Sequence, residues 1–273
     1  MTLTIGEALR TAQAKIGALE ARVLLKSALG CDDAHLIAGA GRALSREEER
    51  AFANLLARRA QGEPVAYLTG LREFYGLQFR VTPVVLIPRP ETELLVDLAL
   101  ERMAPAAGAR VLDLGTGSGC VAIAIARERP RAEVVAVDAS AKAVALAREN
   151  AERHGIRNLA VLNGDWFGAV PGQRFDVIVA NPPYVAAGDP HLAEGDLRFE
   201  PRQALVAGPA GLECIEVVIA SSPGHLVQGG WFLFEHGHDQ AARCRALLTQ
   251  AGFAEVLTRC DLAGIERVSG GRV

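Results

Sequence analysis

The stretch VLDLGTGSG, residues 111–119, decides the fold class of this chain. Val111 to Leu114 form a short apolar run that is typical of a buried strand, and three glycines at alternate positions follow it. A glycine-rich turn between a strand and its helix lets backbone N–H groups approach an anionic or carboxylate-bearing ligand closely. We therefore expect a doubly wound α/β fold with a ligand site at the end of this strand.

Strand-like runs alternate with Ala-rich helical stretches on both sides of this turn. The further strand-like runs are residues 134–138, 159–162, 175–180 and 231–234. Such alternation indicates parallel strands joined by crossover helices. Pro90 suits the first turn of an earlier helix, with Glu91 and Glu93 near its positive end. The pattern predicts a mostly parallel sheet within residues 86–273.

Residues 1–70 predict a small all-helical domain. Apolar residues recur at spacings of three and four from Leu9 to Val23, through Ala12, Ile16 and Leu19, and form one stripe. The segments 4–7 and 45–48 each fit a capping box at a helix start. Residues 71–85, which contain an alternating run with Gly76 at its centre, predict a hairpin that links the two domains.

Composition excludes several classes of protein. Against 29 Lys and Arg stand 32 Asp and Glu, so no global basic field is available to hold a nucleic-acid backbone. The five cysteines are scattered without C-x-x-C spacing, which argues against a disulfide framework and a zinc site and favours a reducing cytoplasm. The N-terminus lacks the apolar region of a signal peptide, and serines, glycines and a proline break the longest uncharged run, residues 217–234. We expect a cytoplasmic protein without a membrane span.

Two residues beyond the glycine turn extend the expected ligand site. Asp138 ends the second strand, where its carboxylate can accept hydrogen bonds from both ribose hydroxyls of a nicotinamide cofactor or of S-adenosylmethionine. Trp166 follows the third strand, where an adenine ring can lie against it, although a core tryptophan is the competing interpretation. The G-x-G-x-G spacing differs from the dinucleotide fingerprint and disfavours a nicotinamide oxidoreductase. For Asp113 a ligand role and a plain strand-end position are equally supported.

The tetrapeptide Asn181-Pro182-Pro183-Tyr184 directly follows the strand at 175–180. Because prolines lack N–H donors and have fixed φ angles, the Pro182 carbonyl can stand free as an acceptor, and the Asn181 side-chain oxygen is a second one. Two acceptors can take both hydrogens of an –NH2 group while the Tyr184 ring stacks on the planar group behind it. The motif predicts methylation of an amide or amine nitrogen by in-line displacement; a turn that only ends the strand is the alternative.

Over nearly its whole length, the sequence resembles the HemK/PrmC family, the glutamine methyltransferases of peptide chain release factors. The matching segments are residues 73–77, 86–93, 113–119, 164–167, 181–184, 189–192, 198–201 and 235–237. The Asn-Pro-Pro-Tyr element alone is shared with adenine-methylating enzymes. Its combination with residues 87–93 is highly specific.

The resemblance implies a class I, Rossmann-like methyltransferase domain that uses S-adenosylmethionine. It implies that the methionine part of the cofactor is held by Gly115, Thr116, Gly117, Ser118 and Gly119. Asp138 is then expected at the ribose, Trp166 at the adenine, and Asn181, Pro182, Pro183 and Tyr184 around the substrate glutamine, with Asn181 also next to the cofactor. The implied substrate is the Gly-Gly-Gln loop of class I release factors, and the helical domain is expected to contact that protein.

Rival functions remain open from the sequence. A methyltransferase of the adenine exocyclic amine would present the same –NH2 geometry, but it would need base flipping and a basic target-reading domain. A non-catalytic translation adaptor would keep the fold without turnover. His236 and His238 form an H-x-H pair, but no third ligand is evident and we expect no metal. We also expect a monomer that does not bind nucleic acid directly.

Overall fold

The computed structural model describes residues 3–103 and 108–273. The chain divides into two compact units, which are considered separately here. One comprises Met1–Leu71 and His191–Phe199, and the other comprises Arg72–Pro190 and Glu200–Val273. The short segment His191–Phe199 therefore groups with the N-terminal helices, although it follows the Asn-Pro-Pro-Tyr motif in the sequence.

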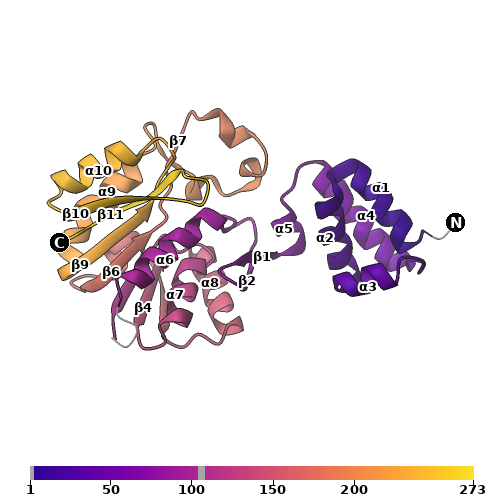
Figure 1. Cartoon of the computed structure of the whole chain (residues 1–273), viewed down its shortest axis with the longest axis horizontal. Helices are drawn as coiled ribbons and strands as arrows, with labels where there is room; N and C mark the ends of the chain where they lie inside the picture. Colours follow the sequence, from indigo (N-terminus) through magenta and orange to yellow (C-terminus); the bar gives the residue numbers. More distant parts are fainter. Residues whose placement is uncertain (1–2, 104–107) are drawn as a thin grey trace. The chain divides into compact units, whose positions relative to one another are not determined.

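The N-terminal unit is built from helices (Figure 1). They are α1 (Ile5–Ile16), α2 (Ala18–Leu29), α3 (Asp33–Ala38), α4 (Arg46–Ala60) and α5 (Val65–Thr69). The capping boxes predicted at Thr4 and Ser45 are both confirmed, because each hydroxyl and the glutamate three residues later satisfy each other's backbone N–H groups. Leu24, Leu25 and Phe52 are buried in the core of this unit.

The continuous apolar stripe expected from Leu9 to Val23 is wrong. Gly17 has a φ of 86° and separates α1 from α2, so the two halves of the stripe lie on different helices. Ala12 is fully buried on α1, whereas Leu19 on α2 is 76% exposed. A glycine tolerates this backbone conformation, and the change of direction breaks the periodicity.

The predicted hairpin is confirmed as β1 (Leu71–Phe74) and β2 (Leu77–Arg80). Tyr75 and Gly76 connect the strands with φ values of 52° and 70°. Two consecutive positive φ values are the mark of a tight turn whose twist matches that of the flanking strands. Phe74 and Phe79 are buried against the larger unit's core.

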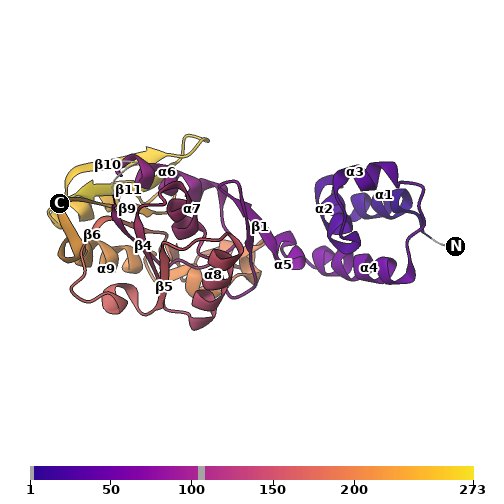
Figure 2. The ribbon, with the colours of Figure 1, turned by 90° about the horizontal axis from the view of Figure 1, so that it is seen from below.

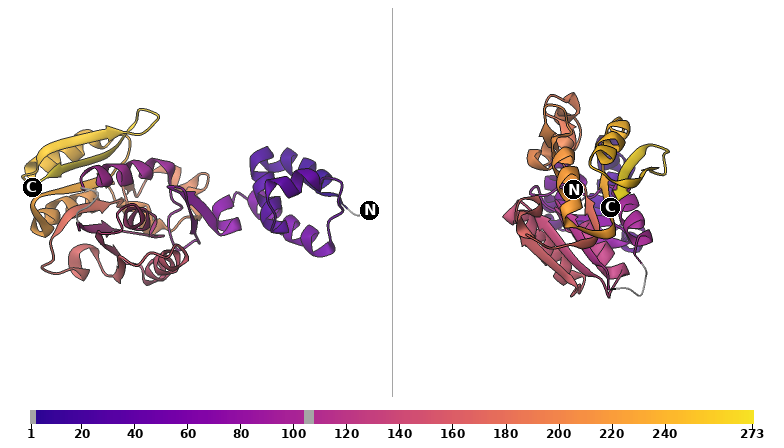
Figure 3. Two further views of the ribbon diagram at one scale, coloured as in Figure 1. Left: turned by 60° about the horizontal axis from the view of Figure 1, so that its bottom comes forward. Right: turned by 90° about the vertical axis from the view of Figure 1, so that its left-hand side faces the viewer.

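A seven-stranded sheet forms the centre of the larger unit, in the order β10-β11-β9-β6-β3-β4-β5. Its five parallel strands are β3 (Arg110–Leu114), β4 (Glu133–Asp138), β5 (Leu159–Asn163), β6 (Phe175–Ala180) and β9 (Leu226–Glu235). These confirm the five predicted strands. At one edge, β11 (Glu266–Arg272) pairs antiparallel with both β9 and β10 (Ala254–Cys260), which the sequence did not predict (Figure 3).

Helices cover both faces of this sheet, which is the doubly wound arrangement (Figure 2). One apolar core includes residues of α6 (Glu93–Glu101), α7 (Cys120–Glu128) and α8 (Ala141–Arg153). The other includes residues of α9 (Glu213–Ser221) and α10 (Ala241–Gln250). Because β3 and β6 are buried on both faces, their apolar residues occupy successive positions rather than alternate ones, interrupted only by Asp113 and Asp176.

Shorter elements complete the described chain. They are the strand pair β7 (Val185–Ala186) and β8 (Val206–Gly208), with single 3-10 turns at η1 (Pro90–Thr92), η2 (Trp166–Ala169), η3 (Pro190–Ala193), η4 (Leu197–Phe199), η5 (Arg202–Ala204) and η6 (Ser222–His225). The helix expected from Pro90 begins with η1 and continues as α6. Among the helices of the described residues, none has the length and apolar character needed to cross a bilayer.

The strand order places a crevice at the carboxyl ends of β3 and β6. From β3 the chain continues to β4 and β5 on one side, and β6 then returns to the other side of β3. The glycine-rich turn follows β3 and the Asn-Pro-Pro-Tyr motif follows β6, so both motifs lie at this reversal point. Ligands of doubly wound sheets bind in such a crevice.

Candidate active site

The glycine turn after β3 requires glycine for two separate reasons. Gly115, Gly117 and Gly119 all have positive φ, at 73°, 56° and 83°. In addition, a Cβ at Gly119 would lie 3.0 Å from the Ile123 Cδ1 and 3.1 Å from the Ala147 Cβ. The alternate glycines therefore set the left-handed backbone of the turn and the close packing of α7 against α8.

Asp138 joins the end of β4 to this turn. Its Oδ2 accepts a hydrogen bond from the Gly117 N–H and its Oδ1 accepts one from the Ser140 N–H, both at 2.8 Å. Burial raises the pKa of Asp138, while these two N–H donors oppose that rise. Each carboxylate oxygen keeps lone-pair capacity for another donor, as a pair of ligand hydroxyls would provide.

Asp113 is not a surface residue at the strand end. It is 2% exposed, and its Oδ2 accepts a 2.6 Å hydrogen bond from the Thr116 hydroxyl. Burial raises the pKa of Asp113 to about 7, against the lowering effect of the Thr116 bond. A titratable carboxyl thus lies beneath the glycine turn.

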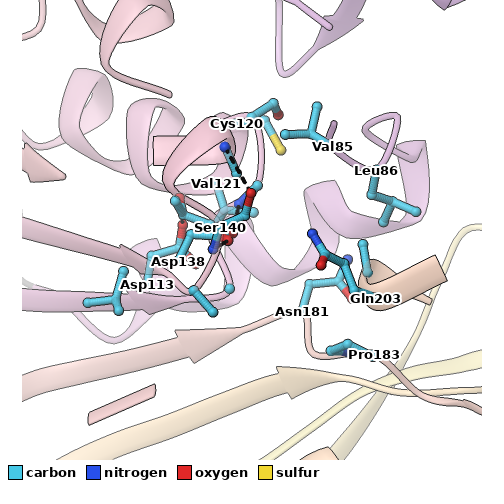
Figure 4. Close-up of a pocket in the computed structure, with 18 of the residues that line it drawn as sticks. Val85, Leu86, Asp113, Cys120, Val121, Asp138, Ser140, Asn181, Pro183 and Gln203 are labelled. Carbon is cyan, nitrogen blue, oxygen red and sulfur yellow. Dashed lines mark hydrogen bonds between the residues drawn. The ribbon is translucent and has the colours of Figure 1, made fainter. Parts of the chain in front are cut away.

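A cavity of about 290 Å3 opens between these motifs. Of the sequence-predicted residues, those that line it are Gly115, Thr116, Gly117, Ser118, Asp138, Trp166, Asn181 and Pro183. Figure 4 shows Asn181 and Pro183 on one side of the cavity, with Asp138 and Ser140 across from them. Gly119, Pro182 and Tyr184 are not among the lining residues. Gly119 instead precedes α7 as its N-cap, and Pro182 is buried.

Asn181 has an unpaired acceptor within the described part of the chain. Its Nδ2 donates to the Thr92 Oγ1 at 3.2 Å, whereas its Oδ1 is buried and has no hydrogen-bond partner there. A buried acceptor without a partner is costly, of the order of 1–3 kcal/mol, so such groups commonly mark a ligand site. The orphan oxygen lies on a residue that lines the cavity.

Tyr184 is held by two hydrogen bonds to other residues of the protein. Its hydroxyl donates to the Glu235 Oε1 at 3.1 Å, and its backbone carbonyl accepts from the Gln240 Nε2 at 3.0 Å. Burial raises the pKa of the Tyr184 phenol, and the nearby Glu235 carboxylate adds to that rise. The hydroxyl is thus fixed by protein, and the stacking of its ring on a substrate remains a prediction.

Four polar residues around the cavity lie outside the predicted site residues, and only for Arg89 did the sequence suggest a place over the cofactor, with helix capping or an exposed ion pair as equal alternatives. Thr92 and Arg89 line the cavity, while Glu235 and Glu200 are buried behind it. Glu200 pairs with Arg89 and also accepts a 3.0 Å hydrogen bond from the Ile87 N–H, so it holds the segment that lines one side of the cavity. The only sequence signal of the other three was the match to the quoted segments 86–93, 198–201 and 235–237.

His236 is occupied by structural hydrogen bonds. It is fully buried, with its Nε2 2.9 Å from the Ser269 Oγ and its Nδ1 2.8 Å from the Gly237 carbonyl. Within residues 3–103 and 108–273, no group of three or more His, Cys, Asp or Glu side chains is arranged to hold a metal ion. The H-x-H pair therefore supplies an internal polar contact through His236.

Two domain families match the chain. Residues 5–70 match the PrmC N-terminal domain, and residues 91–196 match the methyltransferase small domain. The release factor glutamine methyltransferase of Burkholderia pseudomallei is 51% identical over 99% of this chain and 96% of its own length. That of Bordetella pertussis is 53% identical over 93% of this chain and 94% of its own length.

The chain belongs to the release factor glutamine methyltransferase family. The resemblance noted from the sequence is thereby confirmed. A solved structure of a T. thermophilus 16S rRNA methyltransferase in complex with AdoMet and guanosine has the same fold, with a TM-score of 0.55 and 24% identity. It aligns with 74% of this chain and 49% of its own. The family and fold make this chain a class I methyltransferase, and S-adenosylmethionine is its methyl donor.

The cavity fits that donor. A glycine turn offers close backbone approach, the Asp138 carboxylate has free acceptor capacity, and Trp166 supplies an aromatic wall. Trp166 has a φ of 43°, an unusual backbone conformation for a large residue, which its place in the cavity wall would justify. Polar groups at one end and an aromatic surface at the other suit an amino-acid moiety joined to a nucleoside.

Proposed function

We propose that this chain methylates the side-chain amide nitrogen of the glutamine in the Gly-Gly-Gln loop of class I peptide chain release factors. The names of the curated relatives support a release factor as substrate and glutamine as acceptor. The observation that carries the proposal in this structure is the unpaired Asn181 Oδ1. It is an acceptor without a donor, and a primary amide brings two donors.

The acceptor motif would hold the substrate amide through two oxygens. The Asn181 Oδ1 takes one amide hydrogen, and the Pro182 carbonyl, to which the described residues donate no hydrogen bond, takes the other. With both hydrogens fixed, the nitrogen lone pair is directed at the methyl group. Pro183 and Tyr184 would complete the surroundings of the planar group.

The donor would be held at the opposite side of the cavity. We assign the methionine part to residues 115–119, the ribose to Asp138 and the adenine to Trp166, with Asn181 at the boundary between donor and acceptor. When bound, S-adenosylmethionine supplies a methyl group on a positively charged sulfur. Asp113, buried beneath the turn, would face the charged end of the methionine part.

Positioning in a dry cavity is the main contribution of these residues. An amide nitrogen is a weak nucleophile because its lone pair is delocalised into the carbonyl group. Fixing it in line with the reacting methyl group replaces a bimolecular encounter by an oriented one, which can contribute several kcal/mol. The positive charge becomes dispersed during transfer, so exclusion of water favours the reaction more than a strong base would.

Methyl transfer is expected to depend on the loop glutamine of the substrate protein. With radiolabelled S-adenosylmethionine, an intact class I release factor should be labelled, and its glutamine-to-alanine variant should not. DNA rich in adenine, incubated in parallel, tests the exocyclic-amine alternative and should stay unlabelled. Peptide mapping of the labelled protein locates the methyl group.

Three outcomes of this assay would contradict the proposal. Label that survives loss of the glutamine would place the acceptor elsewhere on the release factor. Labelling of DNA would favour the adenine reaction, which uses the same –NH2 geometry. A complete absence of transfer to any substrate, with cofactor still bound, would favour the non-catalytic adaptor.

A fragment that starts at residue 71 is expected to bind S-adenosylmethionine but to methylate a release factor poorly. The reason is that we assign residues 1–70 to partner contacts, residues 71–85 to a linking hairpin and residues 86–273 to catalysis. Calorimetry gives the cofactor affinity, and labelling rates at several release factor concentrations give KM. Equal loss of cofactor binding and turnover would make the helices a folding element instead.

A full-length Arg198→Ala control sharpens that comparison. Arg198 donates a 2.7 Å hydrogen bond to the Gln61 carbonyl, and Arg59 pairs with Asp196 at 3.2 Å, so the segment His191–Phe199 loses these two contacts in the fragment. If Arg198→Ala alone raises KM as much as the deletion does, the position of this segment, rather than the helical surface, accounts for the loss. A monomeric state, a cytoplasmic location and the lack of nucleic-acid binding remain part of the proposal.

A further inference from the structure

A buried hydrogen-bond chain lies behind the Asn181 side chain. The Asn181 Nδ2 donates to the Thr92 Oγ1 at 3.2 Å, and the Thr92 hydroxyl donates to the Glu235 Oε2 at 2.6 Å. The second carboxylate oxygen of Glu235 accepts from the Tyr184 hydroxyl at 3.1 Å. Thr92 and Glu235 are each 2% exposed, so water does not compete for these bonds. The chain thereby connects the first and last residues of the acceptor motif.

The Glu235 carboxylate determines which atoms donate and which accept along this row of hydrogen bonds. Burial raises the pKa of Glu235, while the hydrogen bonds from the Thr92 and Tyr184 hydroxyls oppose that rise by stabilising the ionised form. In that ionised form the carboxylate only accepts hydrogen bonds, so the single proton of Thr92 is directed at Glu235. The Thr92 oxygen is then left as an acceptor for the Asn181 Nδ2. With its amino group committed in this way, the Asn181 amide has one orientation, in which Oδ1 remains unpaired.

We propose that Thr92 and Glu235 are positioning residues that fix the orientation of the Asn181 amide, so that its oxygen rather than its amino group meets the substrate –NH2. This inference rests on the proposed function, because it takes Asn181 as the group that receives the substrate amide. Asparagine has an acceptor and a donor of nearly the same shape, and its amide can rotate to exchange them. Without these hydrogen bonds both orientations are available, and in one of them the Asn181 amino group would meet the two hydrogens of the substrate and repel them.

Three variants distinguish a change in the orientation of the Asn181 amide from a change in side-chain volume. Thr92→Val keeps the shape of the side chain but removes the hydroxyl, and Thr92→Ser restores the hydroxyl. Glu235→Gln replaces one acceptor oxygen by a donor amino group of similar size. If that amino group donates to Thr92, the Thr92 proton turns toward Asn181, and the Asn181 amide rotates so that its amino group faces the substrate.

The test is a double-mutant cycle measured with an intact release factor and S-adenosylmethionine. Thr92→Val and Glu235→Gln should each lower kcat on the order of tenfold or more, with cofactor affinity from calorimetry within about twofold of the parent. Thr92→Ser should recover most of the lost rate. In an Asn181→Ala background, Thr92→Val should lower kcat by less than about twofold further, because the group that it orients is gone.

The other possible results contradict either the inference or the assignment on which it rests. If Thr92→Val and Glu235→Gln turn over like the parent while Asn181→Ala is impaired, the inference falls and the proposed function stands. If Thr92→Val costs the same with and without Asn181, the hydroxyl acts by another route and the inference again falls. If Asn181→Ala itself leaves the rate unchanged, Asn181 is not the acceptor of the substrate amide and the inference falls, whereas absence of transfer by the parent enzyme would contradict the proposed function. Thermal unfolding identifies any variant that is misfolded, and Glu235→Gln then serves in place of Thr92→Val.

Discussion

Replacing Asn181 by alanine is expected to lower turnover on the order of a hundredfold or more, with a much smaller effect on cofactor affinity. The lost group is an acceptor that positions the reacting nitrogen, and removal of such an interaction acts mainly on the transition state. In this structure its Oδ1 is already buried and unpaired, so binding of the substrate amide would relieve that cost. Single-turnover labelling of a release factor measures the rate, and calorimetry measures cofactor binding.

The prediction for Asn181 has a specific contradiction. Asn181 also lines the cavity beside the glycine turn, and the carbonyl of Asn181 would lie 3.8 Å from a Cβ placed on Gly115. If Asn181→Ala weakens cofactor binding as much as it slows transfer, the side chain serves the donor rather than the acceptor. An unchanged melting temperature would show that the loss is not one of folding.

Replacing Asp138 by alanine is expected to weaken S-adenosylmethionine binding by about 1.5–3 kcal/mol, roughly 10- to 150-fold in Kd, because charged acceptor hydrogen bonds to the ribose would be lost. Calorimetric titration measures the change. The structure adds a competing cause, since Asp138 also accepts from the N–H groups of Gly117 and Ser140 and so shapes the turn. Both causes lower affinity in the same direction.

A cofactor analogue that lacks the ribose hydroxyls separates these causes. If Asp138 accepts from those hydroxyls, the variant should lose less affinity for the analogue than for the natural cofactor, because that interaction is already missing. Equal losses for the analogue and the natural cofactor would show that Asp138 acts only through the turn.

The pH dependence of cofactor affinity gives a second readout for Asp138. Burial raises the pKa of this carboxyl, so it protonates earlier than usual as the pH falls and then loses its charge as an acceptor. Affinity should therefore decrease with falling pH in the parent. Asp138→Asn should remove part of that decrease, and the buried Asp113, with a pKa of about 7, accounts for a further part.

Sequence patterns predicted the parallel part of the fold because those strands carry strong local signals. The predicted run 175–180 matches β6 at both ends, and 134–138 matches β4 to within one residue. By contrast, β10 has exposed residues at both ends and half-buried ones between them, without alternation, and β11 contains Ser269, Gly270 and Gly271 among its buried positions. Their pairing is decided by the edge of β9, a long-range contact that no local pattern encodes.

The candidate site likewise contains residues that local sequence patterns predict and residues that they do not. Gly115 and Asn181 are marked by their neighbours in the sequence, since a glycine turn and a proline pair have local conformational meaning. Thr92 and Glu235 carry no such signal, because a threonine or glutamate acquires its role only from what the fold brings against it. These two residues are 143 positions apart and still share a 2.6 Å hydrogen bond. Burial and geometry, rather than residue type, reveal them.

The position of Glu235 at the end of β9 has a consequence for synthesis of the enzyme. All residues that line the cavity lie between Val84 and Ala204, and the ribosome makes them before β9 begins at Leu226. Chains grow from the N-terminus, and β6 gains its β9 neighbour only late in that process. The nascent chain therefore carries every residue that lines the cavity, including Asn181, before it carries the carboxylate that would orient the Asn181 side chain.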